Sequence, residues 1–254
     1  MIETESIDRM GADQALARQA NEFFVNLCRH RYSYHFDWMG RPIVQFPQDI
    51  VAMQELVWQV RPDVIVETGI AHGGSLVFSA SMLALLDMAD AIAAGATMDP
   101  GNSRRRVVGV DIDIRPHNRA AIEAHPMASR IRMIQGSSID PATVAEVHRA
   151  VQDASPRRVL VCLDSNHTHD HVMAELDAYA GLTTPGSYCV VFDTVVERMP
   201  KELFPDRPWG PGDNPMTAVH AWLARHPEFS IDRQIPDKLQ LTVAPDGYLR
   251  RADA

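Results

Sequence analysis

Short apolar, β-branched runs alternate with helix-like segments from residue 63 onward, and this alternation limits the possible folds more than any other feature of the chain. The strand-like runs lie at residues 64–66, 107–110, 131–134, 159–163 and 188–192. The helix-like segments lie at residues 74–89, 116–124, 141–152, 169–180 and 215–225. Strands that are apolar on both faces belong to parallel sheets that helices cover on both sides. The sequence therefore predicts an α/β fold built on a mostly parallel sheet.

The chain before this alternation has a different character. Residues 12–28 place apolar side chains near helical spacing, and Pro47 can open a second helix because proline fits the first helical turn. An aromatic loop at residues 32–40 joins these two segments. We therefore expect residues 1–60 to form an N-terminal helical cap and residues 61–254 to form the main domain.

The chain after residue 214 is expected to complete the sheet. Apolar runs at residues 229–232 and 239–243 flank a short loop that contains Pro and Asp, which is typical of an antiparallel pair. With these two runs the sheet would have seven strands and a C-terminal antiparallel strand. Long connections at residues 90–106 and 194–214 interrupt the alternation, and the second follows a strand end, where such sheets bind ligands.

Composition disfavours several classes of function. The 24 Lys and Arg residues against 33 Asp and Glu residues give a formal net charge of −9, which disfavours nucleic acid as a partner. Cys28, Cys162 and Cys189 lack the spacing of a disulfide framework or a zinc site. No secretory signal and no run of about 18 apolar residues is evident. We therefore expect a cytoplasmic protein without a membrane span.

A glycine-rich turn follows the first predicted strand. The strand ends at Glu67 and the next helix starts at Ser75, and between them lie Gly69, Gly73 and Gly74. Glycine allows a sharp turn and a close ligand approach, and the helix N-terminus offers free N–H groups. The G-x-x-x-G-G spacing differs from the G-x-G-x-x-G of dinucleotide enzymes, and an acid at the strand end disfavours a pyrophosphate. The acid favours a ligand with an ammonium group, such as S-adenosylmethionine, and a turn without a ligand is the alternative.

Two further strand ends could complete a nucleoside site. Asp111 ends the second predicted strand, where a carboxylate can accept hydrogen bonds from both hydroxyls of a ribose. Its alternative role is to cap the following turn. Ser137 and Ser138 follow the third strand and could border an adenine, although turn formation alone would also explain them. We expect these three residues to contact the cofactor. The other expected contacts are Glu67, Gly69, Gly73, Gly74, Ser75 and, at a further strand end, Asp164.

An acidic and histidine-rich stretch follows the fourth strand. Asp164 ends that strand, His167 comes three residues later, and Asp193 follows the fifth strand. Because parallel strand ends meet at one edge, Asp164 and Asp193 should face one crevice beside the cofactor, where two carboxylates suit Mg²⁺ better than zinc. His167 could act as general base, since imidazole titrates near neutral pH. The alternative is that Asp164 and His167 cap the next helix. We expect His169 and His171 to be surface residues of that helix.

Together these segments resemble the cephalosporin hydroxylase/rhamnosyl O-methyltransferase family. The resemblance runs from residue 38 to residue 243, which is most of the chain. The matching stretches are residues 40–49 (GRPIVQFPQD), 66–75 (VETGIAHGGS), 109–113 (GVDID), 163–172 (LDSNHTHDHV) and 192–194 (FDT). The resemblance implies a Rossmann-like methyltransferase fold with S-adenosylmethionine as cofactor. It also implies a divalent metal, usually magnesium, and a homodimer or larger homo-oligomer.

The related macrolide sugar O-methyltransferases extend the resemblance to single residues. It implies Asp164 and Asp193 as metal ligands and His167 as base. The family commonly has Glu-Asp-Thr on the fifth strand, and this chain has Phe192 in place of the glutamate. One metal ligand of that pattern is therefore missing from this position.

These observations predict an S-adenosylmethionine-dependent O-methyltransferase. The acceptor would be a hydroxyl of a sugar or of a glycosylated natural product, with Mg²⁺ assisting the transfer and His167 acting as base. The aromatic side chains of the 32–40 loop could wall the acceptor pocket or pack in the core. The 194–214 segment, with Trp209, could close over the substrate. A non-catalytic cofactor-binding accessory protein stays open as an alternative, as does a nicotinamide-dependent oxidoreductase, which the glycine spacing disfavours.

Overall fold

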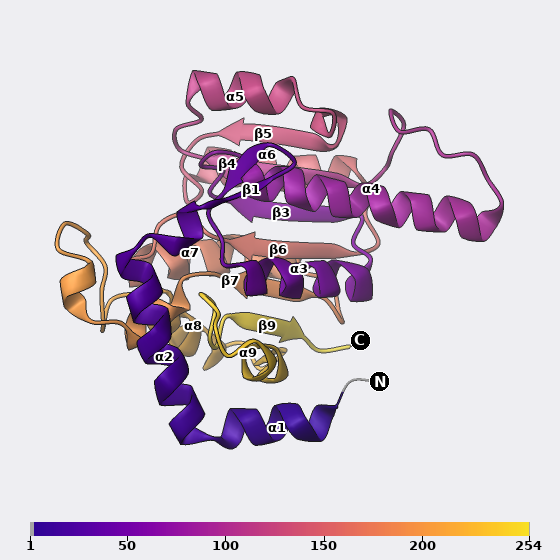
Figure 1. Ribbon diagram of the computed structural model, residues 1–254. Helices are drawn as coiled ribbons and strands as arrows, with labels where there is room; N and C mark the ends of the chain where they lie inside the picture. Colours follow the sequence, from indigo (N-terminus) through magenta and orange to yellow (C-terminus); the bar gives the residue numbers. More distant parts are fainter. Residues whose placement is uncertain (1–2, 254) are drawn as a thin grey trace.

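One mixed sheet forms the centre of the molecule (Figure 1). The computed structural model describes residues 3–253, and within them this sheet has seven strands. In spatial order they are β5 (Ile131–Gln135), β4 (Arg106–Asp111), β3 (Val64–Thr68), β6 (Val159–Leu163), β7 (Tyr188–Val191), β9 (Tyr248–Arg251) and β8 (Phe229–Ile231). The strands from β5 to β7 run parallel, and β9 pairs antiparallel with both β7 and β8. The predicted mostly parallel sheet with a C-terminal antiparallel strand is confirmed.

The helices begin where the sequence offers a proline or a side-chain cap. They are α1 (Thr4–Ala12), α2 (Gln14–Arg29), α3 (Pro47–Val60), α4 (Gly74–Ala94), α5 (Pro116–Glu123), α6 (Pro141–Asp153), α7 (His169–Tyr179), α8 (Pro215–Leu223) and α9 (Gln234–Leu239). Proline occupies the first turn of α3, α5, α6 and α8, where its missing N–H has no intrahelical partner to lose. Asp13, Asp140 and Asn214 accept hydrogen bonds from backbone N–H groups at the starts of α2, α6 and α8.

Helices cover both faces of the sheet, and each face has its own apolar core. On the face that carries α3 and α4, Leu56 and Leu83 belong to one buried cluster (Figure 1). On the other face, Val147, Leu176 and Trp222 of α6, α7 and α8 belong to a second buried cluster. Burial on both faces explains why the parallel strands are apolar at every position.

The C-terminal part of the sheet differs from the prediction at one strand. The strand predicted at residues 239–243 is wrong, because Leu239 ends α9, residues 240–243 form a loop after it, and the last strand is β9. The Oγ1 of Thr242 and the backbone N–H of Val243 instead donate hydrogen bonds to the buried carboxylate of Asp49 at the start of α3. The segment is apolar because it packs on the core as a loop. The loop predicted at residues 233–238 is largely the helix α9.

The aromatic loop predicted at residues 32–40 contains a hairpin. Strands β1 (Phe36–Trp38) and β2 (Arg41–Ile43) pair antiparallel around Met39 and Gly40. The φ angles of these two turn residues are 49° and 81°, and positive φ at both positions is the geometry of a tight two-residue hairpin turn. The hairpin packs on the start of α4, where the glycine-rich turn ends.

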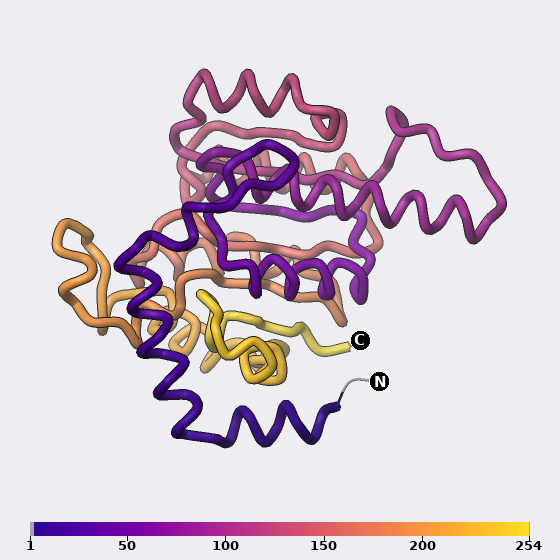
Figure 2. Tube along the Cα trace, in the orientation of Figure 1, coloured from indigo at the N-terminus to yellow at the C-terminus, as the bar shows by residue number. Residues whose placement is uncertain are grey.

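Helix α4 departs from the expectation that no segment is long and apolar enough to span a membrane. Within residues 3–253 it alone meets that criterion, with 21 residues and a mean hydropathy of 1.7 in its most apolar window. Half of that window is buried inside the protein. The first turns, with Leu76 and Leu83, lie in the core, whereas the last turns and residues 95–105 extend away from the body (Figure 2). Burial against the sheet therefore accounts for the apolar character of its first half.

The parallel strands bring polar residues to one edge of the sheet. Asp111 ends β4, Asp164 follows β6, and Asp193 lies two residues after β7. The end of α2 and the segment 194–214, drawn in orange, lie at this same end of the strands (Figures 1 and 2). Ligands of open parallel sheets bind outside these carboxyl ends, so the candidate site belongs here.

Candidate active site

The glycine-rich turn between β3 and α4 uses backbone conformations that glycine favours. Gly69 and Gly73 have φ angles of 87° and 84°. A side chain at Gly69 would overlap the backbone of Asp164, so the two strand ends can approach closely only because this residue is glycine. A side chain at Gly74 would overlap the backbone of Pro42, so Gly74 lets the hairpin pack on the start of α4.

Asp111 holds this turn from the end of β4. Its Oδ2 accepts hydrogen bonds from the N–H groups of Ile70 at 2.8 Å and Ala71 at 3.1 Å. Its Oδ1 accepts a hydrogen bond from the N–H of Asp113 at 3.0 Å. Asp111 therefore caps its own turn and the glycine-rich turn. A carboxylate has about four acceptor directions, so it keeps capacity for a ligand hydroxyl.

Two side chains that the sequence analysis did not single out hold the other side of the turn. Arg41 donates from Nε to the carbonyl of His72 at 3.0 Å and from its terminal nitrogen to Oδ1 of Asn118 at 3.0 Å. Asn118, which is 3% exposed, donates from Nδ2 to the carbonyl of Ala71 at 2.9 Å. These bonds hold Ala71 in a left-handed conformation with φ of 47°. The turn is therefore fixed before any ligand arrives.

Glu67 lies beneath the turn, with its carboxylate directed into the protein. It is 4% exposed and accepts a hydrogen bond from the hydroxyl of Ser79 on α4. Burial raises the pKa of Glu67, and hydrogen bonds from Ser79 and Ser75 oppose this rise. Glu67 and Ser75 line a small cavity together with Gln45.

A cleft of about 260 Å³ opens at the carboxyl ends of β3, β4 and β6. It brings together several residues predicted to contact the cofactor, namely Gly69, Asp111, Ser137, Ser138 and Asp164. The other predicted contacts, Glu67 and Ser75, line the neighbouring small cavity. Gly73 and Gly74 do not line either cavity. Gly73 packs against Ile122, and Gly74 packs against the hairpin. The cleft is therefore formed by strand ends, and the helix start lies to one side.

His171 was predicted to be a surface residue and instead lines this cleft. Its side chain is 18% exposed, and its Nε2 lies 3.0 Å from Oγ of Ser138 and 3.2 Å from Oγ of Ser165. Ser165 also donates to Oε1 of Glu175 at 2.6 Å, and Glu175 is fully buried. The signal in the sequence was the spacing of His171 and Glu175, which places both on one face of α7.

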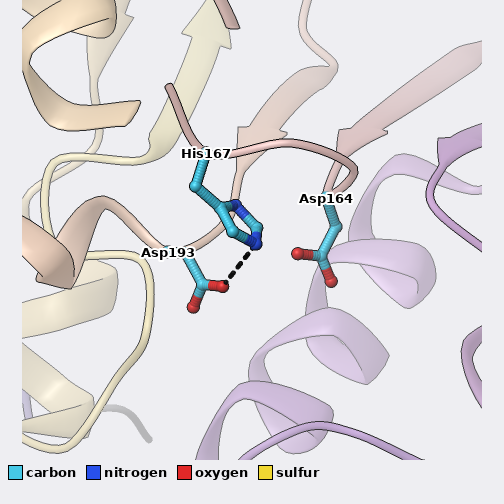
Figure 3. Close-up of side chains that lie close together, drawn as sticks. All are labelled: Asp164, His167 and Asp193. Atoms are coloured by element: carbon cyan, nitrogen blue, oxygen red, sulfur yellow. Dashed lines mark ion pairs between the residues drawn. The ribbon is translucent and has the colours of Figure 1, made fainter. Parts of the chain in front are cut away.

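Asp164, His167 and Asp193 converge beside the cleft (Figure 3). One potential ligand atom from each residue lies within 4.8 Å of the others, so the three groups could together hold a metal ion. His167 Nε2 lies 3.1 Å from Asp193 Oδ2, and the same nitrogen faces Asp164 (Figure 3). Asp164 and Asp193, which were expected to face one crevice, therefore lie close together at the ends of β6 and β7. Phe192 is 5% exposed and belongs to the apolar core.

Negative charge accumulates around Asp164. Burial, reinforced by the neighbouring charges of Asp193 and Glu67, raises the pKa of Asp164 well above its usual range. The side chain of Gln45 donates from Nε2 to Asp164 Oδ2 at 3.3 Å. Asp193 has a φ of 55°, which places it in the left-handed region where few non-glycine residues lie. A site with this charge favours a cation.

The segment 194–214 places an aromatic ring against the histidine. The ring of Trp209 meets the ring of His167 edge to face, with centroids 4.8 Å apart and an interplanar angle of 89°. Asn214 donates to Glu197 and to the carbonyl of Gly210 at 2.9 Å, which ties the two ends of the segment together. Trp209 therefore covers one side of the site in this structure.

The aromatic side chains of the 32–40 loop mostly pack in the core, which was the alternative to their lining an acceptor pocket. Tyr32 lies against Phe36 and Phe46, with ring centroids 5.0 and 5.3 Å apart. Trp38 donates from Nε1 to Oγ of Ser81 at 3.0 Å. Tyr34 is 50% exposed.

Comparison with known protein families gives a match over most of the chain. The family described as Rhamnosyl O-methyltransferase/CmcI matches residues 30–252. A rhamnosyl O-methyltransferase of Mycobacterium tuberculosis (strain ATCC 25618 / H37Rv) is 26% identical over 218 residues, which cover 84% of this chain and 77% of the relative. A rhamnosyl O-methyltransferase of Mycobacterium leprae (strain TN) is 27% identical over 215 residues, which cover 84% of this chain and 82% of the relative.

Solved structures share the fold at lower sequence identity. A structure of CmcI with Mg and SAM superposes with a TM-score of 0.53 at 18% identity, covering 86% of this chain and 77% of that one. An apo structure of CmcI superposes with a TM-score of 0.54 at 18% identity, covering 87% of this chain and 78% of that one. The predicted Rossmann-like methyltransferase fold is confirmed by these superpositions.

Proposed function

The chain belongs to the Rhamnosyl O-methyltransferase/CmcI family, and we propose that it is an S-adenosylmethionine-dependent O-methyltransferase that acts on a sugar hydroxyl. The observation that carries the proposal is a shared residue. Asp164 lines the cleft beside the glycine-rich turn and also belongs to the cluster with His167 and Asp193. Methyl transfer to oxygen requires a cofactor and an activated hydroxyl side by side. The names of the mycobacterial relatives support a sugar as acceptor.

The cleft fits S-adenosylmethionine by its chemistry. Asp111 keeps acceptor capacity for a ribose hydroxyl, and Ser137 and Ser138 offer small polar side chains for the adenine ring. Gly69 leaves room for close approach to the backbone. The cofactor would supply the methyl group, which passes from its sulfonium sulfur to the acceptor oxygen.

The acidic cluster fits a divalent cation, for which we assign Mg²⁺ on Asp164 and Asp193. Both are carboxylates, the ligands that Mg²⁺ prefers, and substrate oxygens can complete its shell. A cation there would lower the pKa of the acceptor hydroxyl and orient it. Phe192 is buried and contributes no ligand, so Asp164 and Asp193 carry the binding.

His167 is assigned as the base. Its Nε2 faces Asp164 and Asp193, so a hydroxyl bound between the carboxylates can pass its proton to this nitrogen in the tautomer that has hydrogen on Nδ1 (Figure 3). The new N–H then donates to Asp193 Oδ2, which stabilises the imidazolium. Trp209 packs on the imidazole and limits its rotation. Positioning of this kind contributes a large part of the rate in transfer reactions.

The proposal includes a two-part organisation, with residues 1–60 as a cap and residues 61–254 as the methyltransferase domain. Burial and the nearby charge of Asp193 raise the pKa of Cys28, on α2, to about 12. The cap therefore borders the site from one side. The proposal includes a cytoplasmic homodimer or larger homo-oligomer, which light scattering of the purified protein would test.

The direct test is methyl transfer from S-adenosylmethionine, labelled in its methyl group, to a panel of rhamnosides, with Mg²⁺ and with EDTA. Transfer that EDTA abolishes and Mg²⁺ restores is the expected result. Unchanged turnover after chelation would remove the metal from the proposal. Calorimetry with S-adenosylhomocysteine and with NAD adds an independent readout, because binding of NAD alone would favour an oxidoreductase.

The role of His167 has its own test. A His167→Ala protein should still bind Mn²⁺, used as a paramagnetic substitute for Mg²⁺, while methyl transfer falls by about 100-fold or more. If the variant loses Mn²⁺ binding as well, His167 is a metal ligand and the base assignment is wrong.

A further inference from the structure

Residues 41–49 join three separate parts of the active-site edge. Arg41 donates to the carbonyl of His72 in the glycine-rich turn. Gln45 donates to Asp164 at the end of β6. Asp49 accepts hydrogen bonds from Val243 at 3.0 Å and from the hydroxyl of Tyr248 at 2.9 Å, near the C-terminal strand. The fixed points on both sides leave the middle of this segment little freedom.

Gln45 is held in that middle and is almost completely buried. It is 8% exposed, between Ile43 and Phe46, which are 2% and 1% exposed. Its Nε2 lies 3.3 Å from Asp164 Oδ2, and its Oε1 is buried without a hydrogen-bond partner. A carboxylate accepts hydrogen bonds, so the amide must present its nitrogen to Asp164. Within residues 3–253, Gln45 is the one side chain that donates a hydrogen bond to this carboxylate.

The charge of the neighbourhood explains why the donor is a neutral amide. The carboxylates near this point are Asp49, Glu67, Asp164, Glu175 and Asp193. In the part of the chain that the structure describes, no lysine or arginine forms an ion pair with any of them. A cationic donor at position 45 would neutralise Asp164 and compete with a bound cation. An amide directs the carboxylate and leaves its charge free.

We propose that Gln45 is a positioning residue for the metal site, which holds Oδ2 of Asp164 so that the carboxylate presents a fixed face toward His167 and Asp193. The inference rests on the proposed function, because it needs the cation that Asp164 and Asp193 are assigned to hold. Side chains that orient a metal ligand typically change metal affinity about 10- to 100-fold when they are removed. Gln45 acts through Asp164 and does not itself contact the reacting atoms.

The test measures Mn²⁺ binding directly, from the electron paramagnetic resonance signal of free Mn²⁺. Gln45→Leu removes the donor and keeps a side chain of similar length. Its Kd for Mn²⁺ should rise about 10- to 100-fold, and saturating Mn²⁺ should restore most of the turnover. Its affinity for S-adenosylhomocysteine, measured by calorimetry, should stay within about threefold of the wild type, because Gln45 does not line the cofactor cleft and the Asp111 side of that cleft is unchanged.

Gln48→Leu is the matched control. Gln48 lies three residues away in the same segment and also has a buried Oε1 without a partner, but it makes no bond to Asp164. Mn²⁺ affinity close to wild type in this control, with loss only in Gln45→Leu, supports the proposal. Equal losses in both variants, or none in Gln45→Leu, overturn it. If the wild type itself binds no Mn²⁺ but still transfers methyl groups, both the metal assignment and the proposed role of Gln45 are wrong. The methyltransferase proposal stands in that case.

Discussion

Two groups of carboxylates lie at opposite ends of the sheet, and they differ in what surrounds them. At the amino end, Asp87 on α4 accepts hydrogen bonds from Ser103, Arg105 and Arg130. Burial acts to raise the pKa of Asp87, but these hydrogen bonds and the charge of Arg130 bring it below the usual value. Arginines therefore fully compensate this carboxylate, and its role is to tie α4 to the starts of β4 and β5.

At the carboxyl end, Asp49, Asp164 and Asp193 form no ion pair with an arginine or lysine in the part of the chain that the structure describes. Burial, with the charges of Asp193 and Glu67, raises the pKa of Asp164 well above its usual range. Burial also raises the pKa of Asp49 to about 6, although three hydrogen bonds oppose the rise. Asp87 shows that this protein can pair a partly buried carboxylate with arginines, and within residues 3–253 such a pairing is not used for Asp164 or Asp49. The difference agrees with the proposed roles, in which one cluster stabilises the fold and the other binds a cation and a substrate.

The largest expected effect comes from Asp164→Asn. Methyl transfer should fall by about 1,000-fold or more, because a bound metal contributes several kcal/mol to such a reaction. The free energy of unfolding at pH 7 should stay unchanged or rise. A carboxyl whose folded-state pKa exceeds its unfolded value destabilises the fold once it ionises. Turnover assays and urea unfolding measure the two quantities.

Asp87→Asn supplies the contrasting variant. The pKa of Asp87 is lowered in the folded state, so its ionised form stabilises the protein, and the substitution should reduce the free energy of unfolding. Its methyl transfer, measured at a temperature where it is folded, should match the wild type. If both variants shift stability in the same direction, the two clusters do not differ as described.

The next largest effect concerns Arg130, one of the arginines that pair with Asp87 at the amino end of the sheet. Arg130 is 3% exposed and bonded to Asp87, so Arg130→Ala removes a buried partner of this carboxylate, while Arg105 stays, and should cost about 1.5 to 3 kcal/mol of unfolding free energy. Arg132→Ala is the control, because both partners of the Arg132–Glu146 pair are 45% exposed. Such a surface pair contributes only about 0 to 1 kcal/mol. Similar losses in the two variants would mean that the amino-end cluster does not stabilise the fold.

The smallest effect concerns the pH dependence of Asp49. Its folded-state pKa is raised from 3.8 to about 6, so the protonated form is favoured in the folded protein. The wild type should therefore lose about 2 kcal/mol of stability relative to Asp49→Asn as the pH rises from 4 to 7, since each pKa unit corresponds to about 1.4 kcal/mol and part of the loss lies below pH 4. Urea unfolding of both proteins across this range measures the difference. A constant gap would show that Asp49 titrates normally.

The fold was largely predictable because burial on both faces leaves a direct record in the sequence. Apolar runs such as residues 159–163 matched parallel strands, and the helix starts at Pro47, Pro116 and Pro141 agree with proline's place in a first turn. The strand predicted at residues 239–243 is wrong because its apolar residues pack around a bond to Asp49. Asp49 and Val243 are 194 residues apart in the sequence, so no local sequence pattern predicts this bond.

The site was predictable where a rule of topology applies. Strand ends of a parallel sheet meet at one edge, which placed Asp111, Asp164 and Asp193 together from sequence order alone. Gln45 could not be found this way, because its bond to Asp164 spans 119 residues and depends on the path of the hairpin. His171 was assigned to the surface because only the fold shows that its face of α7 turns toward the cleft.

The central claim is that the carboxyl end of the sheet binds a divalent cation beside the cofactor and that the amino end does not. Anomalous diffraction from crystals grown with Mn²⁺ and S-adenosylhomocysteine tests it most directly. The account predicts a manganese peak at about 2.0 to 2.4 Å from carboxylate oxygens of Asp164 and Asp193, with cofactor density in the cleft lined by Asp111. No peak there, or a peak beside Asp87 instead, would contradict it.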